Sequence, residues 1–124
     1  MVKLTPPMGW NSWNTFGAKI NEDLIREIAD TMISSGLKAA GYEYVVIDDA
    51  WGAWERGVDG RLHCNTDQFP GGMKTLADYI HSKGLKFGMY SSSGHRTCLG
   101  IAASYDYEFE DAETFASRGV DFLK

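Results

Sequence analysis

The chain has 124 residues, 44% of them hydrophobic and 23% charged, which is the composition of a globular domain with one core. Acidic residues outnumber basic ones 17 to 12, so the net charge is −5 and no basic stripe exists for a phosphate backbone, which excludes nucleic acid as an expected partner. No apolar run reaches the roughly 20 residues of a membrane helix and residues 1–7 lack the apolar segment of a secretory signal, so we expect no membrane partner and a cytoplasmic location.

The first half of the chain predicts a strand, a helix and a second strand. A strand is expected over residues 8–13. Apolar residues then recur at spacings of three and four over residues 21–40, which predicts a helix that Asn21 caps and Gly41 follows. Residues 42–47 are β-branched and aromatic, as is typical of a buried strand.

The same step from helix to glycine to strand occurs twice more. A helix marked by apolar residues over 73–80 is expected to stop at Gly84, before a strand over residues 85–90. A third helix is expected to end near Gly119, before a strand over residues 120–124. Such repetition is typical of successive βαβ units.

We therefore predict one α/β domain over residues 1–124, with parallel strands in the order β-α-β-α-β-α-β and helices on one or both faces. The segments after the second and third strands are long, over residues 52–72 and 91–111. Loops at the carboxyl ends of parallel strands are where such folds place function.

Polar or aromatic residues stand at the end of each predicted strand. They are Trp13, Asp48, Asp49, Tyr90 and Lys124. Because the carboxyl ends of parallel strands meet at one rim of the sheet, we expect these side chains to form a site for a small polar ligand.

The Asp48–Asp49 pair is the strongest local signal, because adjacent carboxylates repel each other unless something binds them. Neighbouring strand residues point to opposite faces, so the pair suits hydrogen bonds to hydroxyls better than the roles of acid and nucleophile in a glycosidase. A Mg²⁺ or Ca²⁺ ion is the rival ligand, and a turn cap beside a solvated carboxylate is the third interpretation.

The remaining motifs predict no cofactor and no metal. His63, Cys64 and Cys98 lack paired zinc-ligand spacing, although the two cysteines could form one disulfide. Residues 91–94 could cradle a phosphate, but they lack the spacing of a P-loop or a dinucleotide fingerprint.

Five segments in order, residues 5–14, 47–51, 69–73, 84–90 and 119–124, resemble the start of an α-galactosidase of the melibiase type, glycoside hydrolase family 27. The resemblance runs the length of the chain. It implies the N-terminal half of a TIM (β/α)8 barrel that hydrolyses terminal α-linked galactose with retention of configuration.

The resemblance also implies a role for each residue at the rim. Trp13 resembles the tryptophan that packs on the galactose ring, and Asp48 and Asp49 resemble the pair that binds the hydroxyls at carbons four and six. Tyr90 resembles a tyrosine that lines the pocket, and Lys124 a lysine that contacts the sugar.

No catalytic residue is expected within the chain, because the resemblance puts the nucleophile two residues beyond Lys124 and the acid/base on a later strand. We therefore expect the 124-residue chain to be inactive alone. Two cysteines of the family are affected: Ala50 stands where a cysteine is common, and Cys98 resembles one whose partner lies just after the nucleophile.

Four strands cannot close into a barrel, so we expect two unpaired edges and an exposed apolar face, covered by self-association as a homodimer or higher homo-oligomer. Galactose or a terminal α-galactoside is the expected ligand, with N-acetylgalactosamine left open. The alternative function is a non-catalytic, self-associating half-barrel that serves as a binding or assembly module.

Overall fold

A computed structural model describes residues 5–124. Its centre is a four-stranded parallel sheet in the order β1-β2-β3-β4. The strands are β1 (Gly9–Asn11), β2 (Tyr44–Val46), β3 (Lys86–Met89) and β4 (Phe122–Leu123). In the register, Trp10 lies opposite Val45 and Val45 opposite Phe87. The predicted parallel order is confirmed.

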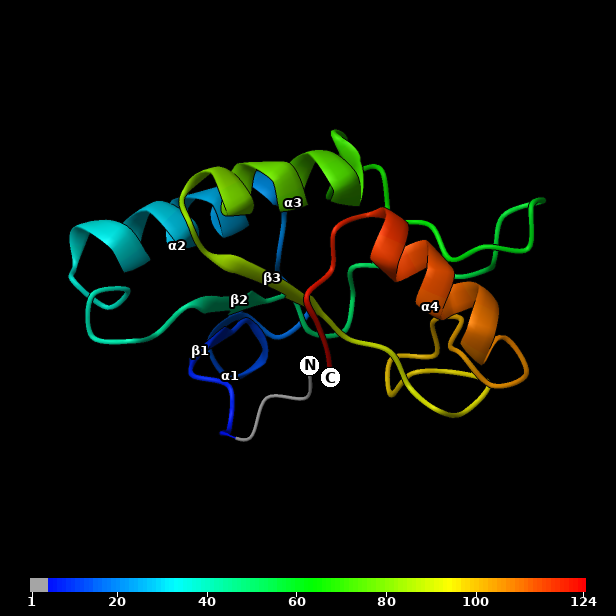
Figure 1. The fold of residues 1–124 in the computed structure, drawn as a ribbon. Helices are drawn as coiled ribbons and strands as arrows, with labels where there is room; N and C mark the ends of the chain where they lie inside the picture. Colours follow the sequence, from blue (N-terminus) through cyan, green and yellow to red (C-terminus); the bar gives the residue numbers. More distant parts are fainter. Residues whose placement is uncertain (1–4) are drawn as a thin grey trace.

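Two long helices cover one face of the sheet, and a third stands beside it (Figure 1). The helices are α1 (Trp13–Phe16), α2 (Glu22–Ser34), α3 (Gly72–Ser82) and α4 (Glu108–Ser117). The short helix α1 was not predicted. Ser12 is its N-cap, so the first strand ends at Asn11 and is shorter than the predicted residues 8–13. No helix within residues 5–124 is long and apolar enough to cross a membrane.

Helix α2 begins where the sequence predicts and ends earlier than predicted. Asn21 caps it, because its side-chain oxygen accepts a hydrogen bond from the Leu24 backbone N–H at 2.8 Å. The helix then stops at Ser34 because Gly36 takes a positive φ of 84°. The prediction of a helix as far as residue 40 was wrong, since Gly36 and not Gly41 ends it.

The core lies between the sheet and the two helices that cover it. Val45, Ile47, Phe87 and Met89 point to this side and are completely buried. Apolar residues of the helices meet them there: Ile25, Ala29, Met32, Leu76, Ala77 and Ile80. Because side chains alternate along a strand, the neighbouring positions point to the opposite face of the sheet.

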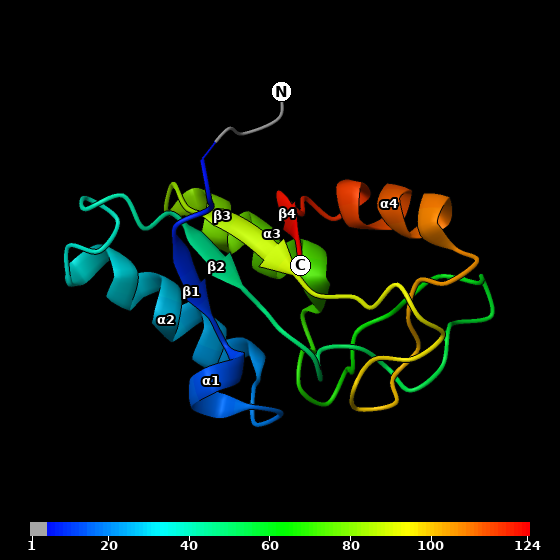
Figure 2. The same ribbon diagram turned by 90° about the horizontal axis from the view of Figure 1, so that it is seen from below.

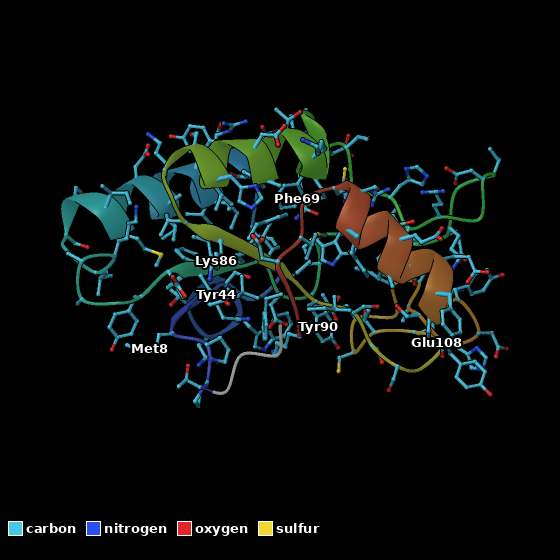
Figure 3. The ribbon with its side chains drawn as sticks, viewed as in Figure 1. Met8, Tyr44, Phe69, Lys86, Tyr90 and Glu108 are labelled. Atoms are coloured by element: carbon cyan, nitrogen blue, oxygen red, sulfur yellow. The ribbon has the colours of Figure 1, made fainter. Side chains whose placement is uncertain are left out.

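The opposite face carries a hollow of about 370 Å³. Tyr44 and Phe122 line it, with their rings edge to face and their centroids 5.8 Å apart. Figure 3 shows Tyr44 and Tyr90 on the side of the sheet away from α2 and α3, and Phe69 on the side of α3. The rim of this open face is the place where the sequence predicts a ligand site.

Candidate binding site at the carboxyl ends of the strands

Asp48 joins the ends of three strands. Its Oδ2 accepts hydrogen bonds from Asn11 Nδ2 at 2.8 Å and from Lys124 Nζ at 2.5 Å. Its backbone N–H donates to Ser12 Oγ at 3.0 Å. Only 4% of Asp48 is exposed, so a buried carboxylate is held by groups from the ends of β1 and β4.

The electrostatics favour the charged form of Asp48. Burial alone would raise the pKa of its carboxyl. The hydrogen bonds from Lys124, the Asp49 backbone N–H and Asn11, together with the charge of Lys124, outweigh burial and lower the pKa of Asp48 below its ordinary value. The site therefore presents a carboxylate that stays ionised in mildly acidic solution.

Asp49 turns toward the loop that follows β3. Its Oδ2 accepts from the Leu99 backbone N–H at 3.1 Å, and its Oδ1 accepts from the Ala50 N–H at 2.8 Å. Asp49 is 3% exposed, and Ala50 takes the unusual φ of 77°. The two carboxylates thus have different neighbours, as the alternation along a strand predicts.

Tyr90 and Lys124 lie side by side at the ends of β3 and β4. The Lys124 ammonium is 5.4 Å from the centroid of the Tyr90 ring, and the Ser91 backbone N–H donates to the Lys124 carbonyl at 3.2 Å. Burial raises the pKa of the Tyr90 hydroxyl, as do its hydrogen bond with Cys98 and the charges of Asp49 and Asp48. The phenol is therefore neutral and can donate a hydrogen bond.

Trp13 faces the open hollow. It is 37% exposed, and its backbone N–H donates to Asn11 Oδ1 at 2.9 Å, which fixes the start of α1 against the end of β1. Trp13, Asn11 and Lys124 all line the hollow of about 370 Å³. Asp48, Asp49 and Tyr90 lie beside it instead of lining it.

Asp121 lies away from this site. Its Oδ2 accepts from the Phe87 backbone N–H at 2.9 Å and lies 2.7 Å from His81 Nε2, before β4 and so at the opposite end of the sheet. The sequence gives the same result, because Asp121 precedes the rim by several residues.

The alternative ligands find little support in the described part of the chain. No group of three or more His, Cys, Asp or Glu side chains there could hold a metal ion. Cys64 and Cys98 are both free, so the disulfide that the sequence left open is not formed. In the loop after β3, the Ser91 hydroxyl pairs with that of Ser104 at 2.6 Å, and Ser92 Oγ accepts from the Gly94 N–H. These serines therefore already bind groups of their own loops.

Asn11 and Ser12 belong to the site but were not predicted as site residues. Asn11 links Asp48 to Trp13 through both ends of its amide, and Ser12 is completely buried against the Asp48 backbone. The signal was their position, because two polar residues at the end of a strand and between two tryptophans must find buried partners.

The chain is similar to known α-galactosidases. A family model described as alpha galactosidase A matches residues 5–124. Alpha-galactosidase A of Cellvibrio japonicus is 54% identical over 120 residues, which cover 97% of this chain and 30% of that protein. The crystal structure of alpha-galactosidase I from Mortierella vinacea matches with a TM-score of 0.94 at 50% identity, over 96% of this chain and 30% of the other.

A structure of the α-galactosidase from Saccharomyces cerevisiae with raffinose also matches, with a TM-score of 0.94 at 45% identity, over 97% of this chain and 26% of the other. This chain therefore spans about 30% of the length of the curated relatives it matches.

Proposed function

The chain belongs to the α-galactosidases of glycoside hydrolase family 27, and we propose that residues 5–124 form one wall of a galactose-binding active site. Since the relatives are about three times as long, hydrolysis of terminal α-galactosides is proposed for a catalytic domain of their size. The raffinose held by one relative, a sugar that ends in galactose, supports this ligand class.

The observation that carries the proposal is the Asp48–Lys124–Asn11 cluster beside an exposed tryptophan. A carboxylate has about four acceptor positions, and three hydrogen bonds occupy those of Asp48, which leaves one for a sugar hydroxyl. Lys124 is half exposed and uses one of its three donors on Asp48. Trp13 offers an aromatic face for the apolar side of a sugar ring.

A titration with galactose tests this site. We expect galactose to bind the wild-type chain, as measured by calorimetry or by the indole signals of its tryptophans. Glucose should bind more weakly, because the two sugars differ only in the configuration of the hydroxyl at carbon four. Asp48→Asn and Trp13→Ala should abolish binding. Asp78→Asn, an exposed carboxylate paired with Lys74, should leave it unchanged. Equal binding of galactose and glucose would contradict the proposal.

We also propose that the 124-residue chain binds galactose without hydrolysing it. A retaining glycosidase needs two carboxyl groups about 5 to 5.5 Å apart on either side of the bond. Asp48 and Asp49 instead accept hydrogen bonds from separate parts of the chain, Lys124 on one side and Leu99 on the other. Nitrophenyl α-galactoside should release no nitrophenol above the buffer rate. A faster release that Asp48→Asn removes would contradict this proposal.

Self-association is the second candidate function, and the edges of the sheet favour it. Among residues 5–124, β1 and β4 each have one neighbour in the sheet (Figure 2), and Leu123 on β4 is 48% exposed. Unpaired edges that carry an exposed apolar residue form a surface for a second copy. Light scattering after size-exclusion chromatography should give a dimer or larger species, and Leu123→Lys should shift it toward the monomer. A stable, folded wild-type monomer at micromolar concentration would contradict this proposal.

A further inference from the structure

Arg118 has a buried guanidinium nitrogen without a partner. The residue directly follows α4, and its Nη1 is buried with no hydrogen-bond partner among residues 5–124. Burial lowers the pKa of the guanidinium below its ordinary value, and the charge of Arg61 adds to this effect. An arginine nevertheless stays protonated at neutral pH. Because a buried cation without a partner is costly, this position favours the approach of an anion.

Two carboxylates whose charges act on Arg118, those of Asp111 and Asp59, are engaged elsewhere. Both oxygens of Asp111 accept hydrogen bonds from Arg56 at 2.7 Å. Oδ1 of Asp59 accepts from the Arg61 backbone N–H at 3.0 Å. These carboxylates therefore serve other groups, and neither forms an ion pair with Arg118.

A hollow of about 250 Å³ lies beside Arg118 at the start of α3. Among the described residues that line it, three can carry a positive charge and none has a carboxylate. The lining includes His63, Cys64, Gly71, Gly72, Lys74 and Arg118. Lys74 pairs with Asp78 on the surface, where both side chains are more than half exposed. Such pairs contribute little, so the Lys74 ammonium can turn to a ligand at small cost.

The start of α3 already attracts a negatively charged oxygen. Gly71 is the N-cap, and its backbone N–H donates to Glu22 Oε2 at 2.8 Å. Glu22 also pairs with Arg26 at 2.7 Å, so the charge of Glu22 is balanced. A Cβ on Gly72 would meet no atom within 4 Å, so the backbone is open on that side. The positive end of the α3 dipole therefore adds to the charge of Arg118 in the hollow.

We infer that the hollow between the start of α3 and Arg118 binds a small oxyanion of the phosphate class. The guanidinium offers parallel N–H groups to two oxygens, and Lys74 offers a second charge to another. This site is independent of the proposed galactose site. The hollow at Arg118 shares no residue with the hollow that Trp13 lines, and α3 covers the opposite face of the sheet (Figure 1).

Thermal unfolding of the chain in inorganic phosphate, against chloride of equal ionic strength at pH 7, tests the site. Two charge-assisted hydrogen bonds correspond to a Kd of about 1 mM. At 10 mM phosphate the occupied form should outweigh the free folded form about tenfold, which raises the Tm by about 4 to 7 °C. The rise should saturate, and the phosphorus NMR signal of phosphate should broaden when the chain is added.

Arg118→Met should abolish both effects of phosphate and leave galactose binding unchanged. Without phosphate, this variant should be at least as stable as the wild type, because it removes an unpaired buried charge. The matched control is Lys83→Met, which removes a positive charge paired with Asp30 just after the other end of α3 and should keep the phosphate effect.

The inference is wrong if phosphate gives no saturable rise in the wild type. An equal rise in Arg118→Met would also overturn it, because phosphate then acts only through its exclusion from the protein surface. A large loss of stability in Arg118→Met without phosphate would show that the guanidinium has a partner within the protein, which contradicts the premise. None of these results depends on whether galactose binds.

Discussion

The ion pair between Arg56 and Asp111 holds the two long loops of the site together. Asp111 is 2% exposed, and each of its oxygens accepts from the Arg56 guanidinium at 2.7 Å. Arg56 also donates to the Ala103 carbonyl and lies over the Tyr107 ring, 3.8 Å from its centroid. Arg56 comes from the loop after β2, and its partners come from the loop after β3 and from α4. We predict that Asp111→Ala strongly destabilises the fold.

The expected loss in the free energy of unfolding is about 3 to 5 kcal/mol, because the substitution leaves a charged guanidinium buried without its partner. Domains of this size are stable by only about 5 to 15 kcal/mol, so the loss is a large part of the total. Urea unfolding followed by circular dichroism, extrapolated linearly to water, measures it. The matched control is Asp78→Ala, because Asp78 pairs with Lys74 on the surface, where such pairs contribute little.

Two results would decide the matter. If Asp111→Ala and Asp78→Ala cost the same, water reaches the guanidinium and the reasoning from burial is wrong. If the reasoning is right, the double variant Arg56→Met with Asp111→Leu should be more stable than Asp111→Ala, because no buried charge is then left unpaired.

The fold could be predicted because two patterns indicate each helix: apolar residues recur with a helical period, and a glycine follows the end. Where the two patterns conflict, the prediction failed. Leu37 continues the period of α2, but it is 41% exposed, and the helix has already stopped before Gly36. The period alone therefore overestimates a helix that contains a glycine near its end.

The site could be predicted in part, since strand ends identify Asp48 and Lys124 but not their contact. β3 lies between β2 and β4 in the sheet, and in a barrel the side chains of alternate strands meet in one layer. One layer below the contact of Asp48 with Lys124, Gly88 on β3 leaves room for side chains of β2 and β4 to approach each other. A Cβ there would lie 2.8 Å from Cγ2 of Val46 and 3.2 Å from Cδ1 of Phe122. The sequence shows a glycine in a strand, but only the register of the strands shows that Val46 and Phe122 are the side chains beside it.

Three further predictions follow from these contacts. Gly88→Ala should destabilise the chain by about 1 to 3 kcal/mol in urea unfolding, because the added methyl group overpacks this face, and an unchanged midpoint would show that Val46 can move away. Asn21→Ala should cost about 1 kcal/mol through loss of the α2 cap, whereas Asn14→Ala, outside any cap, should cost less. Asp48→Asn should lose stability in a pH-dependent way. Because the pKa of Asp48 is lowered in the folded state, its contribution is fully present above the ordinary value of about 3.9 and is lost as the pH falls through the folded-state pKa. The difference in unfolding free energy between wild type and Asp48→Asn should therefore be constant near neutral pH and shrink in acid. A difference that stays the same down to about pH 2 would show that Lys124 and Asn11 do not favour the ionised carboxylate.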